Sequence, residues 1–150
     1  MPGFAWQRAS PTYLHQGQSW ELRKETDRDV FTAARAEEFA REWIAAWNSR
    51  DLGRILGHYS DDVVFSSPFV KTLGGCFTSA VCGREDLREY FESALDKFPA
   101  LHFHLRAVLL GVETVTLLYD SVNGLLAAET MAWNAAGEIE RVWAQYDRVE

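Results

Sequence analysis

Glu129 is the side chain in this sequence best suited to acid–base chemistry. It lies in the segment 125–133, LLAAETMAW, whose residues alternate between two faces if the segment is a strand. The more apolar face is expected to point into the protein. That face carries Ala127, Glu129, Met131 and Trp133. A carboxyl group in apolar surroundings loses its hydration, which favours the neutral form and raises its pKa. Such a group can donate a hydrogen bond, or act as a general acid near neutral pH.

Burial of Glu129 also has a purely structural explanation. The carboxyl group could be held by Trp43, by a hydroxyl group or by water, and serve only to organise the fold. A functional role predicts that a substitution of Glu129 weakens ligand binding or turnover. A structural role predicts mainly a change in stability, of the ~1–3 kcal/mol typical of a disturbed buried polar partner.

The histidines and cysteines are weaker candidates for chemistry. His102 and His104 lie opposite the apolar face of a predicted strand, beside Arg106, which favours an outer sheet face or a subunit interface. A two-histidine metal site lacks a visible third ligand, so we expect no metal and no cofactor. Cys76 and Cys82 are expected to be free thiols because no secretory signal is visible, although an oxidising compartment would permit a disulfide between them.

The elements that position these groups can be traced by periodicity. Apolar residues spaced three and four apart over 32–49 predict a long helix, and Asp51 can cap a short second one. A short strand ends at Pro68, residues 69–82 form a loop, and a third helix follows Gly83. Alternation then predicts strands at 101–110, 115–119, 125–133 and 139–149. The apolar face expected along the first of these is Leu101, Phe103, Leu105, Ala107 and Leu109.

Length and composition set broad limits on the protein. A chain of 150 residues with 47% hydrophobic and 25% charged residues is typical of one globular domain. The net charge of −7 and the scattered Lys and Arg residues argue against a nucleic-acid partner. No apolar run approaches the ~20 residues that span a bilayer, so no membrane partner is expected. With no secretory signal visible, the expected location is the cytoplasm.

The order helix, helix, strand, helix and then four strands predicts an α+β fold with an antiparallel sheet. Residues 39–68, FAREWIAAWNSRDLGRILGHYSDDVVFSSP, together with the Gly83 helix start and the hairpin ETMAWNAAGEIERVWAQYD, resemble the nuclear transport factor 2-like superfamily. The resemblance extends to its SnoaL-like polyketide cyclase and ketosteroid isomerase branches and covers about 33–148. It implies a cone-shaped fold, in which three N-terminal helices pack on a curved antiparallel sheet and enclose a pocket.

The same resemblance argues against steroid isomerase activity. Aligned with the ketosteroid isomerases, Glu129 falls on a pocket carboxylic acid, Trp43 on the oxyanion-hole tyrosine and Ser67 on the general-base aspartate. One of the three positions keeps its chemistry. Because that isomerisation needs a base to move a proton and a phenol to stabilise the enolate, this chain is not expected to catalyse it.

The expected pocket is mostly aromatic and apolar. A three-residue turn at 122–124 would place Tyr119, Leu117 and Val115 on the side of Glu129. Ser67 has no His–Asp relay nearby in the sequence and is expected to be a polar wall contact. With Glu129 as the predicted catalytic residue, the predicted ligand-binding residues are Trp43, Trp47, Ser67, Tyr119, Met131, Trp133, Val142 and Tyr146.

Two functions fit these features. The first is a pocket protein that binds a small, mostly apolar, ring-containing molecule, with acid–base chemistry of the isomerase, cyclase or hydrolase type through Glu129. The alternative is a non-catalytic ligand-binding or dimerisation module. A homodimer through the outer sheet face around His102, His104 and Arg106 is expected, from the mixed polar face of that strand and from what the resemblance implies. Residues 1–30 are expected to be a partly disordered extension of a domain over 31–150, although their aromatic residues could attach them to it.

Overall fold

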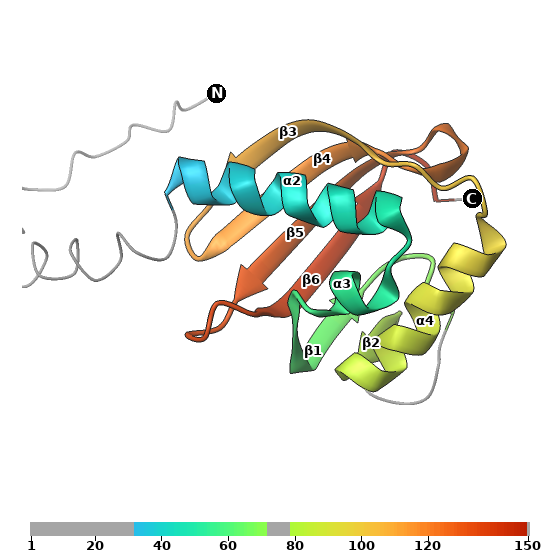
Figure 1. The fold of residues 1–150 in the computed structure, drawn as a ribbon, viewed down its shortest axis with the longest axis horizontal. Coiled ribbons are helices and arrows are strands. Elements are labelled where there is room, and N and C mark those ends of the chain that lie inside the picture. Colours follow the sequence, from blue (N-terminus) through green and yellow to red (C-terminus); the bar gives the residue numbers. More distant parts are fainter. Residues whose placement is uncertain (1–31, 72–78, 150) are drawn as a thin grey trace, which may run out of the picture. The chain divides into compact units, whose positions relative to one another are not determined.

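The computed structural model describes residues 32–71 and 79–149. The predicted N-terminal extension and Cys76 lie outside the described residues. The helices, the strands and one 3-10 turn, shown in Figure 1, follow one another as α2 (Ala33–Ser49), α3 (Leu52–Leu56), β1 (Tyr59–Ser66), β2 (Ala80–Cys82), α4 (Arg84–Lys97), β3 (His104–Leu110), β4 (Thr114–Asp120), η2 (Val122–Gly124), β5 (Leu126–Trp133) and β6 (Ile139–Tyr146).

The described strands form one six-stranded sheet in the order β2-β1-β6-β5-β4-β3. Helix α2 lies across one face of this sheet, where it contacts β3, and α4 contacts β1 and β2 (Figure 1). The α+β prediction, with three helices on a curved sheet, is confirmed. The expectation of a purely antiparallel sheet needs one correction, because β1 pairs with β6 in parallel. Parallel neighbours need a crossover connection, and here α4 and the β3–β5 strands supply it.

Helix α2 forms where the sequence predicts it, and its caps explain its ends. The hydroxyl of Thr32 accepts a hydrogen bond from the backbone N–H of Arg35 at 3.2 Å, which satisfies an N-terminal donor. Arg50 ends the helix in a left-handed conformation with φ of 62°. The buried stripe of the helix faces the sheet, so α2 covers the site described below. The stripe is Ala36, Ala40, Trp43, Ala46 and Trp47.

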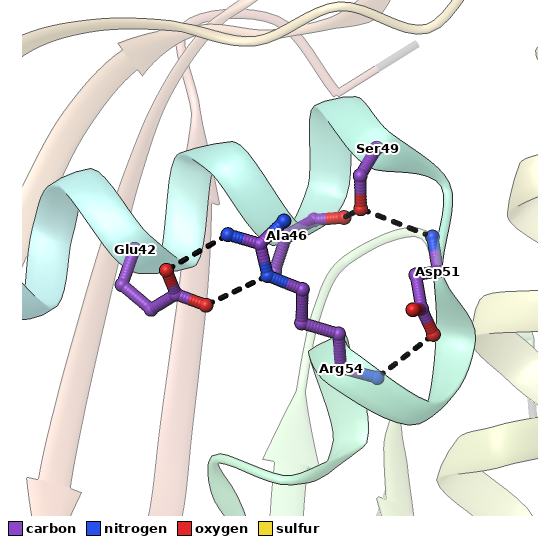
Figure 2. A network of polar contacts seen from close by, with 5 residues as sticks. All are labelled: Glu42, Ala46, Ser49, Asp51 and Arg54. Atoms are coloured by element: carbon purple, nitrogen blue, oxygen red, sulfur yellow. Dashed lines mark hydrogen bonds and ion pairs between the residues drawn. The ribbon is translucent and has the colours of Figure 1, made fainter.

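A polar network fixes the angle between α2 and α3 (Figure 2). Both oxygens of the Glu42 carboxylate accept from the Arg54 guanidinium, each at 2.8 Å. As predicted, Asp51 caps α3, because its carboxylate accepts from the backbone N–H of Arg54 at 3.1 Å. Ser49 donates to the carbonyl of Ala46 at 2.7 Å and accepts from the backbone N–H of Asp51 at 3.3 Å. The turn between the two helices is thus hydrogen-bonded to the end of α2 through Ser49 and to the start of α3 through Asp51.

Two side chains at the end of α2 also fix the chain that follows α4. Asn48 donates to the carbonyl of Phe103 at 2.9 Å and accepts from its N–H at 2.7 Å, in the geometry of a strand pair. Arg50 donates to the carbonyls of Leu95 and Phe98 at 2.5 and 3.0 Å. These carbonyls end α4 and would otherwise lack intrahelical donors.

Strand β3 differs from the prediction in its start and in its faces. It begins at His104, so Leu101 and Phe103 are buried in the connection that precedes it. A register shift between Leu105 and Ala107 inserts one extra residue opposite β4. The bulge turns the alternation over, and Leu109 is therefore 57% exposed rather than on the inner face as predicted. After the bulge, Val108 is the large apolar side chain of β3 that packs against the core.

The segment predicted as a loop before α4 contains a strand and a cross-link. Residues 80–82 form β2, which pairs with β1 through Val81 opposite Phe65. Three residues are too few for alternation to reveal a strand in the sequence. Cys82, at the end of β2, is disulfide-bonded, which corrects the expectation of a free thiol at this position.

Candidate active site

Glu129 occupies the middle of β5, at the centre of the sheet. Its partners across the sheet are Leu117 on β4 and Ala144 on β6. The two rows beside it are Tyr119, Ala127 and Tyr146 on one side, and Val115, Met131 and Val142 on the other. The predicted placement of Tyr119, Leu117 and Val115 on the side of Glu129 is confirmed. This register depends on η2, which occupies Val122–Gly124 as the predicted three-residue turn.

A cavity of about 1110 Å³ lies between the helices and the sheet, and Glu129 is part of its wall. Trp43 and Trp47 line it from α2, and Tyr90 and Phe91 line it from α4. The remaining aromatic wall consists of Phe65, Phe69, Phe98, Phe103, Tyr119 and Tyr146. A volume of this size is at the upper end of the range for small-molecule sites, and a mostly apolar wall is also their usual character.

One oxygen of the Glu129 carboxyl group, Oε2, is buried without a hydrogen-bond partner among the described residues. The side chain is 4% exposed, and within residues 32–71 and 79–149 no donor reaches Oε2. Burial raises the pKa of Glu129 from an ordinary value of 4.5 to about 8. The indole N–H of Trp43, which the structural explanation assigned to this carboxyl, donates instead to the hydroxyl of Tyr59 at 3.0 Å. Trp43 therefore does not hold this carboxyl group, and in the structural explanation a hydroxyl group or water would have to do so.

The other polar groups near Glu129 are tyrosine hydroxyls. Burial raises the pKa of Tyr119 well above its ordinary value, and the neighbouring Glu129 carboxyl adds to the effect. Burial likewise raises the pKa of Tyr90 and Tyr146, while hydrogen bonding by the Ser67 side chain opposes the rise. These hydroxyls stay protonated at neutral pH. The wall thus offers neutral hydrogen-bond donors and few charges.

The predicted site residues separate into two groups. Trp43, Trp47, Tyr119 and Tyr146 line the cavity with Glu129. Ser67 is buried just after β1 and is not among the described lining residues, although it interacts with two of them, Tyr90 and Tyr146. Met131, Trp133 and Val142 are not among the described lining residues. The full set of described lining residues is Trp43, Trp47, Phe65, Pro68, Phe69, Lys71, Tyr90, Phe91, Ser93, Ala94, Lys97, Phe98, Leu101, Phe103, Tyr119, Ser121, Val122, Asn123, Leu125, Glu129, Tyr146, Asp147, Arg148 and Val149.

Trp133 lies outside the cavity because it is two residues further along β5 than Met131. The register shift between Ala132 and Trp133 lies on the β6 side, and Trp133 pairs there with the buried Ile139. Its ring packs edge-on against Phe39 of α2, with centroids 4.8 Å apart. Phe39 in turn contacts the ring of His58 at 5.5 Å. This aromatic group closes the end of the domain beyond the row of Met131.

Sequence reasoning missed Tyr59, Tyr90 and Phe103. Tyr90 precedes Phe91 in the buried stripe of α4, and its hydroxyl could have been anticipated from its place beside that stripe. Phe103 was assigned to a strand face. In the structure the side chain of Asn48 is hydrogen-bonded to the Phe103 backbone, and the Phe103 ring stacks on Trp43.

Among the described residues, no group of three or more His, Cys, Asp or Glu side chains could hold a metal ion. None of the described helices is long and apolar enough to cross a membrane.

Comparison with known proteins places the chain in a known family. The model of the SnoaL-like domain matches residues 40–136. A SnoaL-like protein of unknown function from Burkholderia thailandensis is 36% identical, with a TM-score of 0.74 over 79% of this chain and 99% of that one. No curated protein matches the chain.

More distant structures share the fold. A candidate isomerase of the SnoaL-like family from Agrobacterium tumefaciens is 17% identical, with a TM-score of 0.62 over 77% of this chain and 99% of that one. SalBIII, an epoxide hydrolase/cyclase-like enzyme with a role in pyran ring formation in the polyether salinomycin, is 16% identical, with a TM-score of 0.61 over 75% and 91%. At these identities the likeness concerns the fold alone. On the match to the family model and the 36% identical relative, the chain belongs to the SnoaL-like family.

Proposed function

We propose that this protein binds a small, mostly apolar, ring-containing molecule in the cavity and that Glu129 acts on it as a general acid. The observation that carries the proposal is the buried carboxyl of Glu129, which lines the cavity and whose Oε2 has no partner among the described residues. With a pKa of about 8, Glu129 is mostly protonated at neutral pH. A neutral carboxylic acid can donate its proton to an oxygen atom of a ligand.

The surroundings of Glu129 favour acid chemistry over proton abstraction. Tyr119 and Tyr146 keep their protons at neutral pH, so they too are hydrogen-bond donors. Together they would orient a carbonyl, ether or epoxide oxygen and stabilise negative charge that develops on it. The proposed reaction class is therefore an isomerisation, cyclisation or hydrolysis that begins with protonation of, or hydrogen bonding to, an oxygen. The aromatic walls would bind the ring system of the substrate.

The cavity volume weighs against the alternative of a module without a ligand. Such a module is expected to fill the space between helices and sheet with its own aromatic side chains. The aromatic residues Trp43, Trp47 and Phe103 pack among themselves and leave about 1110 Å³ beside Glu129. Empty apolar volume costs stability, because the atoms that line it lose contacts. A ligand that occupies the cavity would recover them.

A matched pair of probes tests this proposal. 1-Acetylpyrene and 1-ethylpyrene share a ring system, but only the first carries a carbonyl oxygen. We expect both to bind, and Glu129→Leu to weaken binding of 1-acetylpyrene about tenfold, since a hydrogen bond from a buried donor contributes about 1.4 kcal/mol. Binding of 1-ethylpyrene should stay unchanged. The emission spectrum of the pyrene group, titrated with protein, gives both dissociation constants.

Raising the pH tests the same hydrogen bond in the unmodified protein. Glu129 loses its proton as the pH passes about 8, so the preference for 1-acetylpyrene should disappear above that pH. Equal effects of Glu129→Leu on both probes would mean that the carboxyl shapes the cavity without donating to the ligand. Failure of both probes to bind would leave the pocket without support as a site for ring compounds.

We also propose that the protein is a homodimer through the outer face of the sheet. Trp143 lies on that face, where it is 40% exposed and pairs with Thr130 on β5. The Arg141 guanidinium lies 5.3 Å from its ring centroid, which leaves a mixed polar and aromatic surface of the kind found at interfaces. Sedimentation at tens of micromolar should give twice the monomer mass, and Trp143→Glu should shift it to that of the monomer. A monomer without the substitution would contradict the proposal.

A further inference from the structure

We infer that the ligand of this cavity carries a carboxylate in addition to its apolar ring system, and that Lys71, Lys97 and Arg148 bind that carboxylate at the opening. The inference rests on the proposed function, since it assigns a second recognition element to the same cavity. The observation behind it is the contrast between a mostly aromatic wall and the three cationic side chains among its solvent-exposed lining residues.

The opening is marked by those lining residues that are exposed to solvent. Lys97 comes from the last turn of α4, Arg148 from the chain after β6, and Lys71 from the segment after β1. Asp147 is the acidic side chain among the exposed lining residues that the structure describes. Its carboxylate accepts a hydrogen bond from the backbone N–H of Leu126 at 2.9 Å. Cations therefore outnumber acids at the opening of a protein whose net charge is −7.

Two of the cations are held in place by neighbouring groups. Arg148 donates to the carbonyls of Asn123 and Gly124 at 3.4 and 3.1 Å, so its guanidinium stays beside η2. The ammonium of Lys97 lies 5.5 Å from the ring centroid of Phe98, which is itself part of the cavity wall. Side chains that are already positioned lose less entropy when they bind a ligand.

The end of α4 would repel an anion if its carbonyl groups were free. A helix C-terminus carries a partial negative charge, because its last carbonyls lack intrahelical donors. Here Arg50 donates to the carbonyls of Leu95 and Phe98, which satisfies those acceptors and brings another positive charge to this end. Lys97 is thus not required to neutralise the helix end and can bind an external carboxylate.

The charge pattern also orients the ligand. A carboxylate deep in the cavity would lose its hydration among mostly aromatic walls and would find only neutral hydrogen-bond partners there, such as the tyrosine hydroxyls. A carboxylate is far less costly at the solvent-exposed opening, where Lys71 and Lys97 lie. The ring system then fills the aromatic interior, and the end of the ligand opposite the carboxylate reaches Glu129.

The test compares 1-pyrenebutanoate with 1-pyrenebutanol, which share the ring and chain and differ only in charge. We expect the carboxylate to bind about tenfold more tightly, which corresponds to about 1.4 kcal/mol. The double variant Lys71→Gln/Lys97→Gln should reduce this preference to about twofold by weakening the carboxylate alone. Arg41→Gln/Arg88→Gln is the matched control, because it removes the same charge at exposed positions that do not line the cavity and should leave the preference intact.

The salt concentration provides an independent test of the preference for the carboxylate. The preference should shrink between roughly 0.02 M and roughly 0.5 M salt, since exposed charges are screened, while binding of 1-pyrenebutanol stays constant. Equal affinity for the two probes, or equal loss of preference in both double variants, would overturn the inference and leave the proposed function standing. If neither probe binds and 1-acetylpyrene also fails to bind, the proposed function fails and the inference with it.

Discussion

Glu129→Gln should stabilise the protein at neutral pH and flatten the dependence of its stability on pH. Glutamine has nearly the shape of the protonated glutamate but cannot ionise. The pKa of Glu129 is about 8 in the folded protein against an ordinary value of 4.5. Between these two values the folded state holds a proton that the unfolded chain has released, so the free energy of unfolding falls by about 1.4 kcal/mol per pH unit.

The sign and window of this effect follow from the raised pKa. The contribution of Glu129 to stability is fully present below about 4.5, and it is lost as the pH rises toward about 8. At neutral pH the loss amounts to about 3 kcal/mol, which Glu129→Gln should restore. Chemical denaturation at a series of pH values measures the difference. A stability loss of ~1–3 kcal/mol at every pH would instead show that the carboxyl has a structural partner.

Glu42→Gln is the matched control for this experiment. The Glu42 carboxylate is hydrogen-bonded to Arg54, and that interaction lowers its pKa. Its contribution to stability is therefore present above the unfolded pKa and is lost as the pH falls, which is the opposite sign to Glu129. Because this ion pair is exposed to solvent, the effect of Glu42→Gln should be small. The change in the free energy of unfolding caused by each substitution should depend on pH with opposite sign in the two variants. That result would distinguish the effect of a buried carboxyl group from that of an ion-paired one.

The sequence predicted the environment of Glu129 because strand alternation and turn length are local properties. The pattern of 125–133 and the turn at 122–124 together place Tyr119 and Leu117 beside it, and the structure has that register. The same logic failed along β3, where a register shift breaks the alternation. A bulge is decided by the fit of a strand to its neighbour, and nothing in the alternating pattern of 101–110 marks it.

The parts of the site that could not be predicted depend on contacts distant in sequence. The parallel pairing of β1 with β6 joins residues more than 70 positions apart, such as Phe65 and Val142. The cationic opening combines side chains from three separate segments, among them Lys97 and Arg148. A sequence shows that such charges are present but not that they meet. The assignment of the Trp43 indole to Tyr59 rather than to Glu129 was open for the same reason.

Phe103→Ala should produce the second large effect, a loss of stability of about 3 kcal/mol. The ring is 7% exposed and packs against Trp43, Trp47 and Tyr119, with centroids 5.9, 5.4 and 4.8 Å away. Substitution of a buried phenylalanine by alanine costs about 3–5 kcal/mol. The lower end applies here, because one side of the ring already faces the cavity and makes no contacts there.

Phe69→Ala is the appropriate control, because it makes the same substitution in the same cavity wall. Phe69 is half-buried, and its ring packs on that of Tyr146 with centroids 4.6 Å apart. Phe69→Ala should therefore cost less than half of the stability that Phe103→Ala costs.

Asn48→Ala tests the contribution of the Phe103 backbone apart from that of its ring, because it removes both hydrogen bonds to that backbone. Each hydrogen bond contributes about 1 kcal/mol, so a loss of about 2 kcal/mol in stability is expected with the ring still in place.

If Phe103→Ala costs no more stability than Phe69→Ala, the aromatic cluster around Trp43 does not hold α2 over the cavity. The position of α2 over the sheet must then depend on the buried alanine stripe that includes Ala36 and Ala40.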